Sequence, residues 1–289
     1  MQGGNSVNIL ITGQNGYIAR CLHAHLLAGR HDARLVDVRS DAWRHMDFSN
    51  YDSIVHLAGI VHNSSAAPAD FKRVNVELTA ALAQKSYDEN VPQFIFVSTM
   101  AVYGKDYAFT PMNEITAQTP LMPKTFYGKS KLSAEAEVTK IYGDRACIVR
   151  PPTVYGENCT GNYRKLRSLI LRVKVMPRYE NRRGMIYIHN LCELFRLLIE
   201  NTGAGIFYPQ DADFLPTYKL ARLIGENRGV EVLSLRMPFL KTAAKILPDL
   251  KKAFGSLSYA PEMSVCPFGE YRVFDINAAV EQMERYWNS

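Results

Sequence analysis

The sequence lacks the features that would place a protein in or across a membrane. No apolar run in its 289 residues approaches the roughly 18 residues that a bilayer-spanning helix needs. The stretch MQGGNSVNILITG has no basic segment followed by an apolar one, as a secretory signal would. Low-complexity tracts are also absent, and 47% of the residues are hydrophobic against 21% charged, a globular composition. We therefore expect a cytoplasmic protein of one or two domains without integral membrane association.

Cysteines and clusters of charge are also sparse. The five cysteines, at positions 21, 147, 159, 192 and 266, include no C-x-x-C pair. An odd and dispersed set predicts reduced thiols in the core, without a metal site or a structural disulfide. The net charge is +6 and the pI is near 9.0, yet no block of five basic residues occurs. This charge favours a phosphorylated small molecule over nucleic acid as the partner.

Apolar β-branched runs alternate with segments of helical spacing in the first half of the chain. We expect strands within 7–12, 33–40, 51–59 and 92–99, and helices at 17–28, 71–91 and 125–142. The stretch RACIVRPPTVYG (145–156) predicts one more strand followed by a loop. Continuous apolar strands are typical of a parallel sheet that helices cover on both faces. The fold class is therefore α/β, with a doubly wound Rossmann sheet that binds ligands at the carboxyl ends of its strands.

The crossover after the second strand is too short for a full helix. Only 18 residues separate Asp37 from His56, so the stretch SDAWRHMDFSN (40–50) has to form an abbreviated connection.

The alternation weakens after about residue 155. Helical spacing continues at 161–174, 188–202 and 216–229, with a short strand within 205–210. Residues 240–257 form a basic amphipathic region, which we interpret as a solvated helical face, with a membrane-surface role as the alternative. We divide the chain into a dinucleotide-binding Rossmann domain (1–155) and a smaller α/β lobe (156–289), mainly substrate-binding, with some segments returning to the sheet.

A glycine turn joins the first strand to the first helix. It reads Gly13-Gln14-Asn15-Gly16-Tyr17-Ile18-Ala19, with the spacing G-x-x-G-x-x-A. The first glycine permits a sharp exit from the strand, and the second lets the backbone approach a pyrophosphate at the helix N-terminus. The turn therefore predicts a dinucleotide cofactor.

Asp37 stands at the end of the second strand, 24 residues after Gly13. A carboxylate there can accept hydrogen bonds from ribose hydroxyls and repels a 2′-phosphate, which favours NAD. Arg39 could offset that repulsion and admit NADP. The two residues could also form a simple surface ion pair.

Hydroxyl groups and a Tyr–Lys pair converge on the expected cofactor site. Ser98 and Thr99 end a buried strand, and Tyr127 and Lys131 are four residues apart on a predicted helix. Taken singly, the hydroxyls could cap the strand, and the pair could lie on a solvated helix face. Together they predict that the Lys131 ammonium, with the nicotinamide ribose between, lowers the pKa of Tyr127 and makes it an acid and base toward a sugar hydroxyl.

These residues resemble the extended short-chain dehydrogenase/reductases of the NAD-dependent epimerase/dehydratase family. The resemblance rests on TGQNGYIA, HLAG (56–59), VNVELT, FVSTMAVYG, YGKSK, RPPTVYG (150–156) and RRGMIYIHNL (182–191), which occur in the family's order over roughly residues 7–200.

The resemblance implies a catalytic set of Thr99, Tyr127 and Lys131. Residues expected around the cofactor, with Asp47 and Phe48 near adenine, are Gly13, Asn15, Gly16, Tyr17, Ile18, Asp37, Arg39, Asp47, Phe48, Leu57, Ala58, Gly59, Asn75, Tyr127 and Lys131. Residues expected at the substrate are Ser98, Thr153, Asn162, Arg167 and Arg183. Among them, Thr153 replaces an asparagine of relatives such as UDP-galactose 4-epimerase, and Arg183 matches an arginine that binds the nucleotide diphosphate. The family also implies a homodimer.

Met100 and Ala101 depart from the family's 4,6-dehydratases, which have an Asp-Glu pair there to eliminate water. Without that acid, we expect oxidation and reduction at a sugar carbon. The first hypothesis is an NAD-dependent 4-epimerase of a UDP-hexose or UDP-N-acetylhexosamine in surface polysaccharide synthesis. A 4-ketoreductase of a UDP-4-keto-6-deoxy-hexosamine is the close alternative, and a non-catalytic dinucleotide-binding protein is the third.

Overall fold

Six parallel strands form the central sheet of the computed structural model, which describes residues 6–61, 67–159 and 162–287. Their order is β10 (Gly205–Phe207), β6 (Cys147–Val149), β4 (Gln93–Val97), β3 (Ser53–His56), β1 (Asn8–Thr12) and β2 (Asp32–Val36). The order reverses at β1, because the chain continues to β2 on one side and then returns to β3 on the other. Ligands of open α/β sheets bind at such a reversal.

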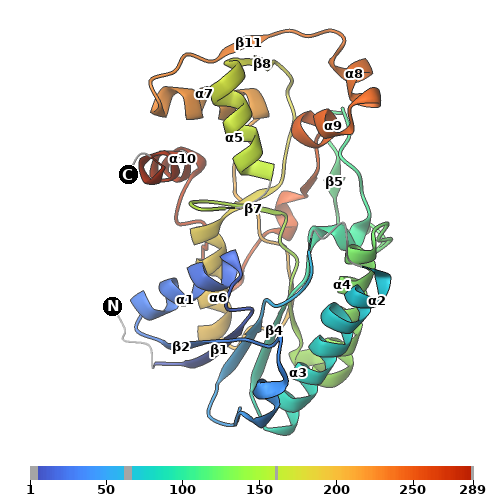
Figure 1. The fold of residues 1–289 in the computed structure, drawn as a ribbon, viewed down its shortest axis with the longest axis vertical. Coiled ribbons are helices and arrows are strands. Elements are labelled where there is room, and N and C mark those ends of the chain that lie inside the picture. The colour runs from blue at the N-terminus through green and yellow to red at the C-terminus, as the bar shows by residue number, and fades with distance from the viewer. Residues whose placement is uncertain (1–5, 62–66, 160–161, 288–289) are drawn as a thin grey trace.

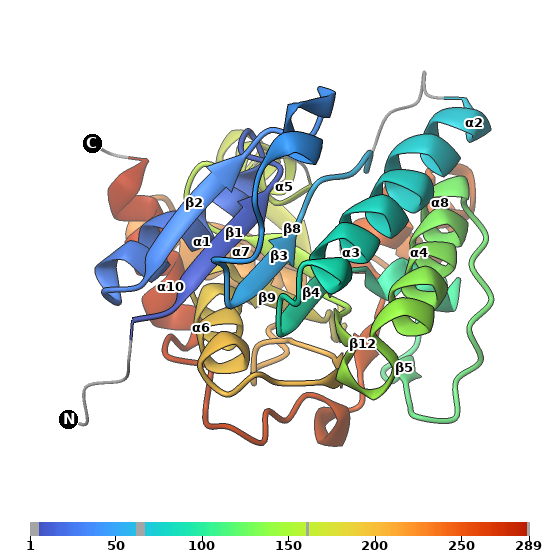
Figure 2. The same cartoon turned by 90° about the horizontal axis from the view of Figure 1, so that it is seen from below.

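Helices cover both faces of the sheet, as Figures 1 and 2 show. α1 (Tyr17–Ala28) and α6 (Ile188–Glu200) pack together on one face. The other face carries α2 (Pro68–Phe71), a π-helical segment (Lys72–Glu77), α3 (Leu78–Asp88) and α4 (Phe126–Tyr142). Alternate side chains of β1 point to opposite faces, so Ile9 and Ile11 belong to the core under α1 and α6, whereas Leu10 belongs to the core under α3 and α4. The predicted α/β sheet is confirmed.

The abbreviated crossover is also present. A single 3₁₀ turn (Asp41–His45) connects β2 to β3, and its Trp43 is almost completely buried. Tryptophan thus supplies with one side chain the apolar cover that a full helix would provide.

The second half of the chain adds three short two-stranded sheets. These pair β7 (Thr153–Tyr155) with β9 (Met185–Tyr187), β8 (Val175–Pro177) with β11 (Leu233–Leu235), and β5 (Glu114–Ile115) with β12 (Ser258–Tyr259). The loop expected at 150–156 therefore contains a strand, which was missed because it is only three residues long. Around these sheets lie α5 (Asn162–Val173), α7 (Thr217–Asn227), α8 (Leu240–Ile246), α9 (Pro248–Phe254) and α10 (Ile276–Tyr286), with 3₁₀ turns at Met100–Tyr103, Gly143–Arg145 and Pro261–Met263.

The basic region 240–257 is not one amphipathic helix. It breaks between α8 and α9 at Leu247, whose backbone is non-helical (φ −115°, ψ 88°) because Pro248 follows it. Ser256 and Leu257 at its end are buried. In the part of the chain that the structure describes, none of the helices has both the length and the hydropathy to span a bilayer.

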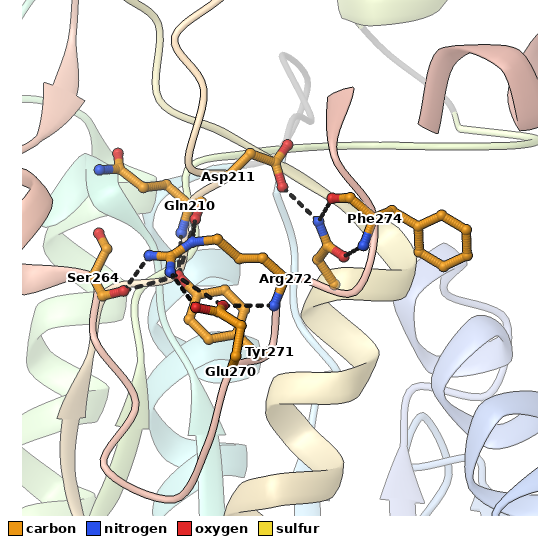
Figure 3. A network of polar contacts seen from close by, with 8 residues as sticks. Gln210, Asp211, Ser264, Glu270, Tyr271, Arg272 and Phe274 are labelled. Carbon is orange, nitrogen blue, oxygen red and sulfur yellow. Dashed lines mark hydrogen bonds and ion pairs between the residues drawn. The ribbon is translucent and has the colours of Figure 1, made fainter. Parts of the chain in front are cut away.

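A buried polar network ties the C-terminal segment to the body of the protein (Figure 3). Asp211 accepts hydrogen bonds from Asn190 Nδ2 at 2.9 Å and from the Tyr187 N–H at 3.2 Å. Asn190 Oδ1 accepts the Phe274 N–H at 2.9 Å, and Arg272 Nε donates to the Gln210 carbonyl at 2.9 Å. Segments far apart in sequence are held together by these bonds, and burial raises the pKa of Asp211 to about 6.

Candidate active site

The glycine turn brings the end of β1 against the loop that follows β3. Gly13 has φ +83°, and a Cβ there would lie 3.0 Å from the Ala58 nitrogen. The Gly16 N–H donates to the Gly13 carbonyl at 2.7 Å, and α1 begins at the next residue. A Cβ on Gly16 would lie 3.0 Å from the Gly13 carbonyl, so both positions of the turn favour glycine because the backbone is close, as in turns that hold a pyrophosphate.

The other predicted residues of the glycine turn, Asn15, Tyr17 and Ile18, differ in how exposed their side chains are. Asn15 is exposed and Ile18 is partly buried. The Tyr17 hydroxyl is buried, has no hydrogen-bond partner among the described residues, and would lie 2.5 Å from a Cβ on Gly156. The phenol of Tyr17 therefore packs inward, so the expected contact with a cofactor would have to come from its backbone.

A buried histidine, which was not among the predicted site residues, holds the loop after β3 (57–60), which we call the cofactor loop because the resemblance expects the cofactor there. The Thr12 hydroxyl accepts the N–H groups of Leu57 and Ala58 at 3.1 and 3.2 Å. Its own proton is therefore directed to His56 Nδ1, 2.7 Å away, so His56 Nε2–H donates to the Thr79 hydroxyl at 2.9 Å. Such a chain of bonds requires a neutral imidazole, and burial lowers the pKa of His56 to about 3.

Asp37 and Arg39 form an ion pair at the end of β2. Arg39 donates to the carboxylate through its backbone N–H at 2.9 Å, through Nε at 3.0 Å and through Nη2 at 2.5 Å, and Gln14 Nε2 donates at 3.2 Å. The hydrogen bonds from Arg39 lower the pKa of Asp37 to about 2, so the carboxylate is ionised at neutral pH.

The side chain of Phe48, which was expected near the adenine, lies in the core. Its ring is fully buried, its N–H donates to Glu89 at 2.5 Å, and its carbonyl accepts from Tyr51 at 3.0 Å. The phenyl ring of Phe48 is therefore not available to a ligand. Asp47 beside it is exposed, and hydrogen bonds from Ser49 lower the pKa of its carboxyl.

Asn75 is a positioning residue behind the cofactor loop. It is fully buried, and its amide bonds both backbone groups of Ile60, at 2.8 and 3.0 Å, and the Ser130 hydroxyl at 3.0 Å. This corrects the prediction that Asn75 lines the cofactor. Gly59 is exposed in front of it, and a Cβ there would lie 3.0 Å from Asn75 Oδ1 and 3.7 Å from Lys131 Nζ. The cofactor loop thus meets the helix that carries Lys131.

The catalytic candidates converge at the start of α4. A side-chain hydrogen bond joins Tyr127 to Thr99, which also accepts the Ala101 N–H at 3.2 Å. Lys131 is almost fully buried, donates to the Val97 carbonyl at 2.7 Å, and lies 4.5 Å above the Phe96 ring.

Burial shifts the pKa values of both Lys131 and Tyr127. It lowers the pKa of Lys131 to about 8, and it raises the pKa of Tyr127 to about 12 although the Thr99 hydrogen bond acts in the opposite direction. The lowered tyrosine pKa is predicted for the complex with the cofactor, and in the chain by itself burial keeps the pKa of Tyr127 high. Tyr127 carries its proton at neutral pH and can donate it to a substrate oxygen.

Ser98 belongs to a buried polar cluster behind the site. Its hydroxyl donates to Glu135, whose carboxylate accepts from Arg150 Nε at 3.0 Å and Nη2 at 2.6 Å. Arg150 Nη1 also donates to the Tyr103 hydroxyl at 2.9 Å. This corrects the expectation that Ser98 contacts substrate, because its side chain is buried and occupied. Glu135 was missed, although it lies one helical turn beyond Lys131 on the same face of α4.

Arg183 is a buried guanidinium without a carboxylate partner. Its side chain makes no ion pair with any described residue and its Nε is unbonded; Nη1 donates to the Ala253 carbonyl at 3.4 Å, and the guanidinium lies 5.5 Å from the centre of the Tyr107 ring. Thr153, partly buried, lies nearby because β7 pairs it with Met185 on β9. A buried cation of this kind is expected to bind an anion.

Arg167 and Asn162 were also predicted to contact the substrate, and only Arg167 has a side chain that the structure describes. Arg167 donates to Glu284 at 2.7 and 2.6 Å and stacks 4.2 Å from the Trp287 ring, so it links α5 to α10 and is not free for substrate. Asn162 begins α5, and its side chain lies outside the part that the structure describes. Met100, at the position of the dehydratase acid, is buried.

The chain is similar to several known proteins. The model of the NAD dependent epimerase/dehydratase family matches residues 9–208. An N-acetyl-alpha-D-glucosaminyl-diphospho-ditrans,octacis-undecaprenol 4-epimerase of Escherichia coli O157:H7 is 27% identical over 214 residues, which are 70% of this chain and 62% of that protein. A UDP-glucose 4-epimerase of Vibrio cholerae is 26% identical over 245 residues, 74% of each chain. The structure of the Bordetella bronchiseptica enzyme WbmG in complex with NAD superposes with a TM-score of 0.74 at 16% identity, over 99% of this chain and 95% of that one.

Proposed function

The chain belongs to the NAD dependent epimerase/dehydratase family, and from this premise we propose that it is a nucleotide-sugar 4-epimerase. One observation carries the proposal: the cofactor loop at Gly59 packs beside Lys131, on the helix whose Tyr127 is hydrogen-bonded to Thr99. This constellation can move a proton at a sugar hydroxyl next to a nicotinamide.

The residues of the cofactor cradle are compatible with NAD. Gly13, Gly16 and the N-terminus of α1 would hold the pyrophosphate, and the Asp37 carboxylate would accept the ribose hydroxyls. When bound, NAD supplies the hydride acceptor and donor. Asp37 is the reason to favour NAD, and Arg39 beside it leaves NADP possible.

Tyr127 is proposed as the acid and base at the C4 oxygen. In the reduction it donates the proton that it carries at neutral pH. In the oxidation it has to accept the hydroxyl proton, so its pKa must fall from about 12. The Lys131 ammonium, one helical turn away, is the group that can stabilise the phenolate, and Thr99 orients the same oxygen. An epimerase carries out both steps and lets the 4-keto sugar turn between them.

The positions of Met100 and Ala101 argue against dehydration. Neither side chain can protonate a leaving hydroxyl, and Met100 is 8% exposed. Loss of water from a sugar needs such an acid. The proposed chemistry is therefore confined to C4.

Arg183 and Thr153 are the proposed substrate contacts. The unpaired guanidinium suits a diphosphate, which Arg binds well. Both relatives described above are named as 4-epimerases of a sugar on a diphosphate, which is attached to uridine in one and to undecaprenol in the other. We propose a UDP-hexose or a UDP-N-acetylhexosamine as substrate, surface polysaccharide synthesis as the role, and a cytoplasmic homodimer as the working form.

The Asp37–Arg39 pair favours a second candidate. Because Arg39 offsets the Asp37 charge, the site could admit NADPH and exchange it at each turnover. The protein would then be a 4-ketoreductase of a UDP-4-keto-6-deoxy-hexosamine.

Denaturing the purified protein and identifying the released cofactor distinguishes the two. We expect stoichiometric NAD, and interconversion of the C4 epimers of a UDP-sugar by NMR without added cofactor. A protein that is purified without cofactor and consumes NADH or NADPH with a 4-keto sugar would support the reductase instead of the epimerase.

A further inference from the structure

β11, α8 and the segment between them lie at the end of the molecule remote from the central sheet (Figure 1), and this segment carries several exposed apolar side chains. Phe239 and Ile246 are 77% and 78% exposed. We call the set of exposed apolar residues in this segment the apolar surface; its members are Leu233, Leu235, Met237, Phe239, Ile246 and Leu247. Single exposed apolar residues are ordinary, but a concentration within one short segment indicates an interaction site.

The apolar surface is held outward by the packing of α8. Leu240 and Ala244, four residues apart, are buried and fix the inner side of the helix. At 100° per residue, Phe239 and Ile246 then lie along one flank, and Lys241 and Lys245 along the other. The helix therefore presents apolar and cationic side chains together to the exterior.

The charge of the segment indicates an anionic partner. Residues 232–254 contain five basic residues and one acidic residue, which gives 5 − 1 = +4. Arg236 and Lys245 form no ion pair with any residue that the structure describes. A second copy of the chain would bring two such surfaces together and oppose like charges. Phospholipid head groups offer the opposite charge beside an apolar layer.

This segment also adjoins the proposed diphosphate site. α9 follows α8 directly, and the carbonyl of its Ala253 accepts hydrogen bonds from Thr217 Oγ at 2.7 Å and Arg183 Nη1 at 3.4 Å. A partner on α8 would therefore lie one short helix away from the substrate.

We propose that the apolar surface, with Arg236, Lys241 and Lys245, docks the protein on an anionic bilayer. Phe239 and Ile246 enter the head-group region, and the cations lie against lipid phosphates. The assignment of the neighbouring Arg183 site to a diphosphate rests on the proposed function. The proposed docking on a bilayer does not depend on it.

Flotation with vesicles tests the proposal on the full chain. Wild-type protein should float with vesicles of phosphatidylcholine and about one third phosphatidylglycerol, more weakly at high salt, and not with phosphatidylcholine alone. Lys241→Gln with Lys245→Gln should weaken the partition about 25-fold, roughly five-fold for each charge. Phe239→Ser with Ile246→Ser should weaken it by more than about ten-fold.

Val265→Ser is the matched control, because Val265 is 66% exposed on another part of the chain. It should float as wild type does, and thermal melts should be the same for all variants. Wild-type protein that stays with the soluble fraction, or serine variants that float unchanged, would overturn the proposal. If the wild-type protein self-associates and the same substitutions abolish this association, the apolar surface would instead be an interface with a second copy of the chain. Flotation needs no turnover, so failure of the proposed epimerase activity would be seen separately.

Discussion

Replacing His56 by glutamine should make the free energy of unfolding fall less steeply as the pH is lowered from 7 to 5. His56 is fully buried and neutral, with a pKa of about 3 against 6.5 for the ordinary side chain. The unfolded chain therefore binds a proton at this residue between pH 6.5 and 3, and the folded protein does not. The stability that the neutral ring contributes is present above pH 6.5 and is lost as the pH falls through this window.

The size of the effect follows from the two pKa values. With about 1.4 kcal/mol for each tenfold change in proton affinity, the difference from 6.5 to about 3 amounts to about 5 kcal/mol over the full window. Between pH 7 and pH 5, where carboxylates contribute less, His56 alone should lower the free energy of unfolding by about 2 kcal/mol.

Urea denaturation of wild type and His56→Gln at several pH values between 5 and 7 measures this contribution. Glutamine keeps one acceptor and one donor for Thr12 and Thr79 but binds no proton. The variant should be less stable at pH 7, because the ring packing is lost, but its stability should fall by about 2 kcal/mol less on going to pH 5. Equal slopes for both proteins would refute the reasoning that His56 is held neutral.

Three further substitutions test other parts of the site. Glu135→Gln leaves the buried Arg150 charge unpaired and should cost about 3–5 kcal/mol in urea denaturation at pH 7; a loss below about 1 kcal/mol would contradict the buried pair. Arg183→Ala should raise KM for the UDP-sugar more than it lowers kcat, while Arg182→Ala, at a neighbouring side chain that is 35% exposed, should change neither much; a fall confined to kcat would remove the diphosphate role. Asp37→Ser should shift binding from NAD toward NADP in fluorescence titration, and an unchanged preference would take Asp37 out of cofactor selection.

The sequence predicts most of the sheet because its strands are continuous apolar runs. The helix from Tyr17 to Ala28 and the shortened crossover before β3 also follow from local signals, namely the glycine turn and the chain length available. The break between α8 and α9 could be read only in retrospect from Pro248, because an amphipathic pattern continues across it. Strand β7 was missed because three residues carry too little periodicity.

The candidate site also has a part that the sequence predicts and a part that it does not. Motif spacing brought Thr99, Tyr127 and Lys131 to one place, because parallel strands end at one edge of a sheet. It did not show which polar side chains turn inward: Ser98 meets Glu135 across 37 residues of sequence, and Arg167 meets Glu284 across 117. Such pairings depend on packing between distant segments, which no local pattern encodes.

Turnover by Tyr127→Phe is the most direct test of the central claim that this tyrosine moves the proton at C4. The variant should retain bound NAD and the wild-type thermal stability, but its epimerisation of a UDP-sugar should fall by a factor of about 10² to 10⁴. Tyr87→Phe, at a 43% exposed position, is the control and should be fully active. Wild-type turnover by Tyr127→Phe would contradict the account.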